Sequence, residues 1–245
     1  MTVRTLVIGI PLPHVTFDNY SFASAPSLSE YTRLIVEMES VSRVVEEIAR
    51  GSLDHSTFAG QPVANAATTA RAFGLADLLA MRRREAEQFF KRRGTALCVA
   101  HPDVAHDGIA GLEHWRRYEW LPEPAAFRYE TDLLPGFGKG SVLVTDPVDP
   151  FAAYVAAYGK HMAYRAYASR QPESAPALRV FAKSSAGVPV GFELSLLGGR
   201  LVFVPPLDAP REDRSAIAGT LFECFERYEA ERTDQSPDGI HKEAS

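Results

Sequence analysis

Short apolar runs and amphipathic stretches follow one another along the chain. Continuous apolar runs over residues 5–10, 33–38 and 95–100 are typical of strands buried on both faces of a sheet. After the second run, apolar residues at helical spacing predict a helix that Ser40 caps and Gly51 ends. This alternation predicts an open, mostly parallel sheet covered by helices.

The connections in the first half of the chain are longer than those of a minimal α/β fold. Residues 52–62 predict a loop, and residues 63–93 predict a helix in two pieces that divide near Gly74. The polar and aromatic stretch between the first two strands is too irregular to predict a helix. Residues near 101–140, rich in Pro and Gly, interrupt the alternation and predict an irregular insertion.

The period changes again in the C-terminal half. A fourth strand over residues 141–145 and a helix over 150–169 precede three strand-like segments. These segments predict an antiparallel meander, closed by a tight Gly198–Gly199 turn and followed by a helix over 212–231. The expected fold is α/β, a three-layer and mostly parallel sheet with an antiparallel C-terminal meander. The meander strands are residues 178–185, 188–197 and 200–206.

Composition excludes several classes of protein. The chain has 245 residues, 46% of them hydrophobic, as in ordinary soluble proteins. No run approaches the ~20 apolar residues that a membrane helix needs, and the first residues lack the features of a secretory signal. We expect a single α/β domain over residues 1–232, a disordered tail over 233–245, and no association with a membrane.

The two cysteines indicate in which cellular compartment the protein lies, and they do not indicate a catalytic role. Cys98 and Cys224 both lie in apolar stretches, which predicts buried thiols and no disulfide framework. Cys98 also lacks the flanking glycines that place a nucleophile on a sharp strand-to-helix turn. We therefore expect a reducing compartment, the cytoplasm, and a structural role for both thiols.

The glycine-rich stretch LLPGFGKGSVLVTD, residues 133–146, resembles a phosphate loop at first sight. A phosphate loop follows a strand and leads into a helix, whose free N–H groups complete the cradle. Here Gly136, Gly138 and Gly140 follow a loop and lead into a strand. The order predicts a flexible lead-in or β-bulge, with a phosphate contact through Lys139 as the alternative.

The most metal-like residues follow the third strand, in the stretch HPDVAHDG. His101, His106 and Asp107 would lie at the carboxyl edge of the sheet, where α/β proteins bind ligands, and Glu37 and Glu39 would face the same edge. The spacing matches no strong zinc pattern, so we predict no metal and no cofactor. A catalytic role, with a glutamate as general base, stays open beside that of a solvated strand end.

Two segments carry charge and aromatic rings in patterns that partners recognise. The stretch MRRREAEQFFKRR predicts a basic helix face, with a solvated surface as the first interpretation and an acidic partner or nucleic acid as the next. The stretch HWRRYEW predicts a short helix that contacts a protein partner, although packing on the domain itself also explains it. The basic face comprises Arg82, Arg83, Arg84, Lys91, Arg92 and Arg93, and the partner-binding segment comprises Trp115, Arg116, Arg117, Tyr118 and Trp120.

Four stretches, TLVIGI, YTRLIVEM, RRREAEQFFKRRGTALCV and GVPVGFELSLLGGRLVFVPPL, together carry a family resemblance. Their order resembles the class I glutamine amidotransferase-like fold, in particular its non-catalytic members. Catalytic members carry their nucleophile in a G-x-C-x-G turn, which this chain lacks. The resemblance implies a scaffold without glutaminase chemistry.

These observations favour a non-enzymatic binding or scaffold subunit of a larger cytoplasmic assembly, whose partners are other protein subunits. We expect at least one of the two indoles of the HWRRYEW segment to be exposed for that contact. Two alternatives remain: a small-molecule hydrolase or transferase that uses Glu37, His101, His106 and Asp107, and a nucleic-acid-binding accessory protein.

Overall fold

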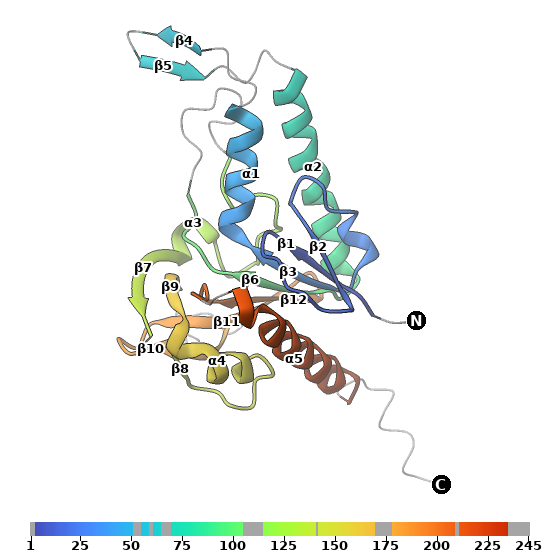
Figure 1. The fold of residues 1–245 in the computed structure, drawn as a ribbon, viewed down its shortest axis with the longest axis vertical. Coiled ribbons are helices and arrows are strands. Elements are labelled where there is room, and N and C mark those ends of the chain that lie inside the picture. Colours follow the sequence, from blue (N-terminus) through green and yellow to red (C-terminus); the bar gives the residue numbers. More distant parts are fainter. Residues whose placement is uncertain are drawn as a thin grey trace.

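The computed structural model describes residues 3–50, 55–58, 61–64, 70–104, 115–140, 142–169, 178–208 and 211–234. Its centre is a mixed sheet of eight strands with helices on both faces (Figure 1). The strands follow one another across the sheet as β2 (Phe17–Tyr20), β1 (Thr5–Ile8), β3 (Arg33–Glu37), β6 (Thr95–Val99), β12 (Gly199–Val204), β11 (Pro189–Leu196), β10 (Leu178–Ser184) and β8 (Val142–Val144).

The sheet is parallel in its first half and antiparallel in its second. Strands β2, β1, β3, β6 and β12 pair in parallel, whereas β12, β11, β10 and β8 pair antiparallel. Strand β12 belongs to both halves, because it ends the meander and also pairs with β6. The predicted α/β class, mostly parallel with an antiparallel C-terminal meander, is confirmed.

Alternate residues of the parallel strands face two different hydrophobic cores. Leu34 and Val36 pack into one core with α1 (Met38–Arg50) and α2 (Ala70–Lys91). Ile35 packs into the other with α4 (Ala152–Tyr158) and α5 (Arg214–Asp234). The strands are therefore buried on both faces, as their continuous apolar runs predict, and Figure 1 shows the two helix pairs on opposite sides of the sheet.

Smaller elements connect this core. Strands β7 (Leu133–Lys139) and β9 (Ala163–Ala168) form a separate antiparallel pair that contacts β11. The remaining elements are η1 (Leu28–Glu30), the hairpin of β4 (His55–Phe58) and β5 (Gln61–Ala64), α3 (Tyr129–Asp132), η3 (Gly159–His161) and η4 (Arg211–Asp213). No helix among the described residues is both long and apolar enough to cross a membrane.

The predicted helix over residues 63–93 is wrong in two respects. Its first residues belong to strand β5, whose hairpin also takes up part of the predicted loop. The helix itself runs without a break from Ala70 to Lys91, and Gly74 lies on its exposed side. A solvent-exposed glycine costs a helix about 1 kcal/mol, which tertiary packing of the rest of α2 offsets.

The predicted helix over residues 150–169 is also wrong beyond Tyr158. Gly159 lies so close to the backbone of Val142 that a Cβ there would be 2.7 Å from the Val142 carbonyl oxygen. The chain turns at this point and continues as strand β9. Strand β2 was missed as well, because three of its four residues are not fully buried, as befits the edge of a sheet.

The glycine-rich run lies in strand β7 and in the turn that follows it. A side chain at Gly136 or Gly138 would overlap the rings of Tyr167 and Tyr164 on strand β9. The strand pairing shifts register between Pro135 and Gly138, as the bulge prediction requires. The run leads into β8 and not into a helix, so the order that a phosphate loop needs is missing.

Two further predictions meet the limits of the described residues. Helix α5 continues to Asp234, beyond its predicted end at residue 231. The rest of the predicted tail, residues 235–245, lies outside the described part of the chain. In the predicted insertion, residues 115–121 form turns in place of the expected short helix, and residues 105–114 are outside the described residues.

Candidate ligand site at the strand ends

A pocket of about 430 Å³ lies at the carboxyl edge of the parallel strands. Residues at or just beyond the ends of β1, β3, β6 and β12 line it, and α5 and β7–β9 close its other sides. Open α/β sheets bind ligands at this edge, and pockets of this size hold small molecules. We call it the strand-end pocket.

The floor of the strand-end pocket is apolar. Ile35 and Leu97 come from adjacent strands, Ile217 and Leu221 from helix α5, and Tyr154 from helix α4. All five side chains are buried in the same hydrophobic core. The floor is therefore rigid and suits an uncharged part of a ligand.

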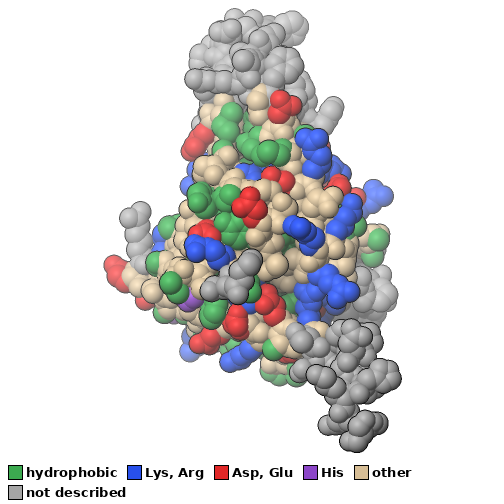
Figure 2. Space-filling model, turned by 90° about the vertical axis from the view of Figure 1, so that its right-hand side faces the viewer, with side chains coloured by type: hydrophobic (Ala, Val, Ile, Leu, Met, Phe, Trp, Pro, Cys, Tyr) green, Lys and Arg blue, Asp and Glu red, His purple; other side chains and the backbone are tan. Residues whose placement is uncertain are grey.

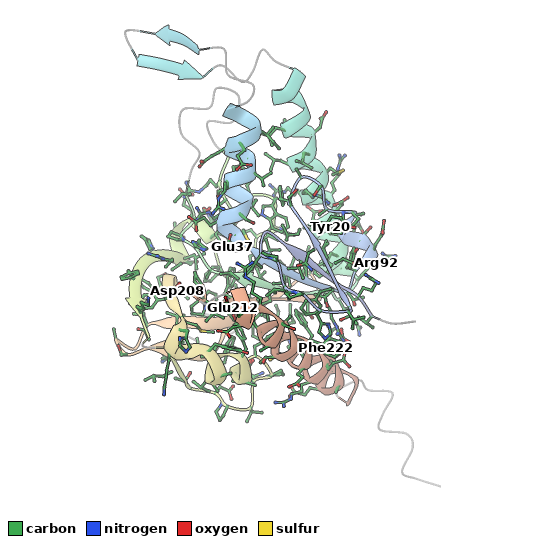
Figure 3. All side chains as sticks on the ribbon, in the orientation of Figure 1. Tyr20, Glu37, Arg92, Asp208, Glu212 and Phe222 are labelled. Carbon is green, nitrogen blue, oxygen red and sulfur yellow. The ribbon has the colours of Figure 1, made fainter. Side chains whose placement is uncertain are left out.

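Glu37 occupies one corner of the pocket, where strand β3 becomes helix α1. Its side chain accepts hydrogen bonds from the backbone N–H groups of Glu39, at 3.2 Å, and Ser40, at 2.6 Å. Glu37 therefore caps the helix, a role that the sequence assigned to Ser40. Ser40 instead donates its hydroxyl to the Glu37 carbonyl oxygen. Figure 3 labels Glu37 at this junction.

His101 lies against Glu37 because their strands are neighbours in the sheet. Glu37 pairs in register with Val99, two residues before His101. The Nε2 atom of His101 is 2.9 Å from Glu37 Oε1, and its Nδ1 atom is 3.8 Å from Glu39 Oε2. The structure thus brings together three of the residues that the sequence placed at this edge. His106 and Asp107 lie outside the described residues.

A buried tyrosine fixes the backbone of His101. The hydroxyl of Tyr118 donates to the His101 carbonyl oxygen at 2.7 Å and accepts from the His101 N–H at 3.2 Å. Tyr118 is 1% exposed. Sequence reasoning assigned this residue to a partner surface and missed its positioning role, for which the sequence carries no signal.

The environment keeps the Glu37 carboxyl group ionised. Burial alone would raise its pKa, but the hydrogen bond and charge of His101 and the two N–H groups of the helix lower it below the usual value. Glu39 is more accessible, with a side chain that is 55% exposed. This corner therefore combines a fixed carboxylate, an imidazole and a mobile carboxylate.

Four cationic side chains surround the rest of the pocket. They come from four different elements, so they form no sequence motif. These residues are Arg43 of α1, Lys139 of β7, Arg165 of β9 and Arg214 of α5. Sequence reasoning singled out Lys139 and missed the three arginines.

Two of these cations have contacts that define their positions. The Lys139 Nζ atom is 2.8 Å from Asp208 Oδ2, and both side chains are largely exposed. Figure 3 labels Asp208 on the β9 side of the pocket. The Arg165 guanidinium lies over the ring of Phe137, 4.8 Å from its centre. Within the described part of the chain, no ion pair is found for Arg43, Arg165 or Arg214.

Both tryptophans, Arg117 and Tyr118 of the HWRRYEW segment are packed into the protein. Trp115 is 5% exposed and Trp120 is 1% exposed, so the expectation of an exposed indole is wrong. Arg117 is buried too and donates to Ser42 Oγ and to the Pro102 carbonyl oxygen, both at 2.8 Å. The aromatic rings complete the core on the α1–α2 face. Partner binding through this segment stays a prediction.

Arg82, the first residue of the predicted basic face of α2, is buried and not on the surface. Arg82 is 1% exposed and donates hydrogen bonds to the carbonyl oxygens of Ala25 and Pro26 and to Glu85. The other five basic residues of the face are exposed. Figure 2, which looks at the side of the molecule that carries α2, shows Lys and Arg side chains with acidic side chains between them. Nucleic-acid binding stays a prediction.

Both cysteines are buried and free, as predicted. Burial raises the pKa of the Cys98 thiol well above its usual value and that of Cys224 to about 11. Neither thiol is therefore a nucleophile at neutral pH in the folded protein.

A second cluster of carboxylates lies between the meander and α4. Asp149 is buried, its Oδ1 atom accepts from the Phe151 N–H at 2.9 Å, and its Oδ2 atom has no hydrogen-bond donor among the described residues. Arg179 Nη1 is 3.6 Å from Asp149 Oδ2 and 3.9 Å from Glu193 Oε1. Burial and the Glu193 charge raise the pKa of Asp149 to about 6.

Comparisons with known proteins add little to this geometry. No protein-family model matches the sequence, and no curated protein matches it in sequence. A Thermoplasma acidophilum protein provisionally described as a GMP synthase subunit is 9% identical, with a TM-score of 0.40, over 95% of this chain and 99% of its own. A cytoplasmic protein from Salmonella typhimurium is 10% identical, with a TM-score of 0.41, over 92% and 98%.

Neither of these two similarities carries an argument about fold or function, because both TM-scores are below 0.5. The resemblance to the class I glutamine amidotransferase-like fold therefore stays a prediction. The strand topology shows the α/β class without it.

Proposed function

We propose that the protein binds, in the strand-end pocket, a small molecule that has an apolar body and an anionic group. The observation that carries this proposal is the convergence of Arg43, Lys139, Arg165 and Arg214 around an apolar floor. Guanidinium and ammonium groups donate charge-assisted hydrogen bonds to carboxylate and phosphate. The buried floor would hold the body of the ligand, and the cations would hold its charge.

Matched probes test this proposal. In the presence of a chelator, we expect 4-phenylbutyrate or phenyl phosphate to raise the melting temperature, whereas the uncharged 4-phenylbutyramide does not. Arg165→Gln and Arg214→Gln should each weaken anion binding, and Arg84→Gln, on the exposed face of α2, should not. Equal binding of the anion and its amide, or binding unchanged by both pocket variants, would contradict the proposal.

An assembly role is the second candidate, supported by the position of β8 as the last strand of the sheet among the described residues. Strand β8 pairs with β10 and ends the sheet; Leu143 within β8 is 59% exposed, and Val148, four residues beyond its end, is 73% exposed. Edge strands with exposed apolar side chains are sites where another chain pairs. We therefore propose that, if the protein is a subunit of a cytoplasmic assembly, its partner contacts β8.

Sedimentation of the purified complex tests the assembly role. The wild type should sediment with its partner above the 26.9 kDa of the single chain, and Leu143→Glu should release it. The exposed variant Leu197→Glu, on the hairpin between β11 and β12, is the control. A wild type that sediments as a single chain from native extract, or a complex that Leu143→Glu leaves intact, would contradict this role.

An enzymatic use of the same pocket rests on one contact. In the tautomer whose Nε2–H points to Glu37, Nδ1 of His101 is the ring nitrogen that can accept a proton. A hydrolase or transferase that activates water at this atom would lose turnover of p-nitrophenyl esters in His101→Asn and keep it in His161→Asn. Turnover that survives His101→Asn would exclude it.

A further inference from the structure

We infer that Glu37, Glu39 and His101 form a binding site for one divalent transition-metal ion of the Zn²⁺ type. The inference deepens the ligand-binding function proposed above, because it adds a cation at the corner of the pocket where two carboxylates and an imidazole meet. One ligand atom from each of the three residues lies within 4.8 Å of the other two. We call this group the Glu–Glu–His corner.

The distances at the Glu–Glu–His corner suit coordination. Metal–ligand bonds of about 2.1 Å place neighbouring ligand atoms roughly 3–4 Å apart around one ion. Glu37 Oε1 and His101 Nε2 are 2.9 Å apart, close to that spacing. Glu39 Oε2, now nearest to the other ring nitrogen, belongs to a side chain that is 55% exposed and free to rotate toward the ion.

Two of the three ligands are held rigidly, which lowers the entropy cost of binding an ion. The Ser40 N–H donates to Glu37 Oε2 at 2.6 Å and the Glu39 N–H to Oε1 at 3.2 Å, so the carboxylate keeps its orientation with Oε1 beside His101. The hydroxyl of Tyr118 holds the backbone of His101 on both its N–H and its carbonyl oxygen. Such outer contacts are typical of residues that orient metal ligands.

The donor set selects the class of ion. One imidazole nitrogen and two carboxylate oxygens suit Zn²⁺ and related transition metals, whereas Ca²⁺ and Mg²⁺ prefer oxygen ligands alone. Three protein ligands leave coordination positions open toward the pocket, as at metal sites that bind a substrate or water. An anionic ligand held by Arg165 and Arg214, which line the same pocket, would complete the coordination sphere.

Calorimetric titration of the full chain with ZnCl₂, after removal of metal by a chelator and without any purification tag or anionic ligand, tests the site. We expect one Zn²⁺ per chain, and at least about tenfold weaker binding in His101→Asn and in Glu39→Gln. His161→Asn, which removes an exposed histidine outside the corner, should bind Zn²⁺ as the wild type does.

Glu39→Gln keeps the test decisive if His101→Asn does not fold, because the exposed Glu39 side chain is not needed for packing. The inference is overturned if the wild type binds no stoichiometric Zn²⁺, if Glu39→Gln binds as tightly as the wild type, or if His161→Asn is the variant that loses the ion. Anion binding is measured with a chelator present and Zn²⁺ binding without an anion, so failure of one proposal is distinguishable from failure of the other.

Discussion

Glu37 and Asp149 have similar local roles, and their pKa values are shifted in opposite directions. Glu37 accepts from two backbone N–H groups in the first turn of α1, Asp149 accepts from the Phe151 N–H just before α4, and both carboxyl groups are largely removed from solvent. The pKa of Glu37 is lowered, because His101 and two N–H groups outweigh its burial. The pKa of Asp149 is raised to about 6, because its burial and the charge of Glu193 outweigh Arg179 and one N–H group.

The difference shows what separates a candidate site from a structural cluster in this protein. Glu37 is kept charged at a corner that opens into a pocket, beside residues that a ligand can reach. Asp149 lies in the interior with one oxygen atom that no described donor binds. A capping interaction alone therefore does not set the charge of a carboxylate; the balance between desolvation and nearby partners does.

Arg179→Met should have the largest effect on this comparison. It removes the cation that lies within 4 Å of both Asp149 and Glu193 and also binds Asp146. We expect a loss of about 2–3 kcal/mol in the free energy of unfolding at pH 8, below the full value for a buried pair because Arg179 is 39% exposed. Urea unfolding at pH 8 and pH 5 measures the loss, which should shrink at pH 5 as Asp149 binds a proton. An equal loss at both pH values would show that Asp149 is not the group that depends on Arg179.

Asp149→Asn should change the pH dependence of stability. The folded-state pKa of about 6 exceeds the usual 3.8, so the folded protein holds a proton that the unfolded chain has released between these values. This group therefore makes the wild type less stable as pH rises from about 4 to 7, and Asn removes that decrease. The variant should gain on the order of 2 kcal/mol relative to the wild type across this window.

Unfolding curves at pH 4.5, 6 and 7.5 check the Asp149→Asn prediction. Asp146→Asn is its control with the opposite sign, because Arg179 and nearby N–H groups outweigh partial burial and lower the pKa of Asp146. The stability that Asp146 contributes is present above its usual pKa of 3.8 and is lost as pH falls below it, so a further curve at about pH 3 is needed to observe the opposite sign. Parallel curves for wild type and Asp149→Asn would show that this carboxyl group titrates normally.

Glu37→Gln should cost about 1–2 kcal/mol in the free energy of unfolding at pH 7, since it removes a charged cap and a charge-assisted contact with His101. Because the folded-state pKa lies below 4.5, this contribution is present above pH 4.5 and is lost as pH falls through the lower value. Denaturant unfolding at pH 7 and pH 3.5 measures it. If Glu37→Gln were equally destabilised at pH 7 and at pH 3.5, the lost stability would come from side-chain packing and not from the charge of Glu37.

Glu39→Gln should have the smallest effect, within about 0.5 kcal/mol at pH 7, because exposed charges contribute little to stability. The same unfolding measurement checks it. If this variant were as unstable as Glu37→Gln, the exposed carboxylate would be a structural partner of His101 and not a group available to a ligand.

Much of the fold could be predicted from the sequence, and the failures share a cause. The meander strands and the final helix were predicted because their period is a local feature, but the turn predicted at Gly198–Gly199 lies one residue earlier, at Leu197 and Gly198, because Gly199 pairs with Leu196 as the first residue of β12. Strand β9 was predicted as helix, because the six residues AYRAYA are too few to distinguish the helical period from the strand period. Only the pairing with β7 shows that this segment is a strand. Arg82 and Trp120 were predicted as surface residues. Arg82 is buried by its contact with the loop of Ala25, and Trp120 by its contact with the ring of Phe22, and both contacts are distant in the chain.

The residues of the candidate site also divide into those that the sequence could place and those that it could not. Residues at the ends of β3 and β6 had to meet if these strands were parallel neighbours, so the sequence was sufficient to place Glu37, Glu39 and His101 at one edge. It could not place Arg43 or Arg165 there, because they come from elements whose packing has no local signature. Strand and helix patterns arise from contacts between residues close in the chain, whereas a pocket arises from contacts between residues far apart. The sequence alone therefore determined the α/β class and the acidic corner, and only the tertiary structure decided which cations face it.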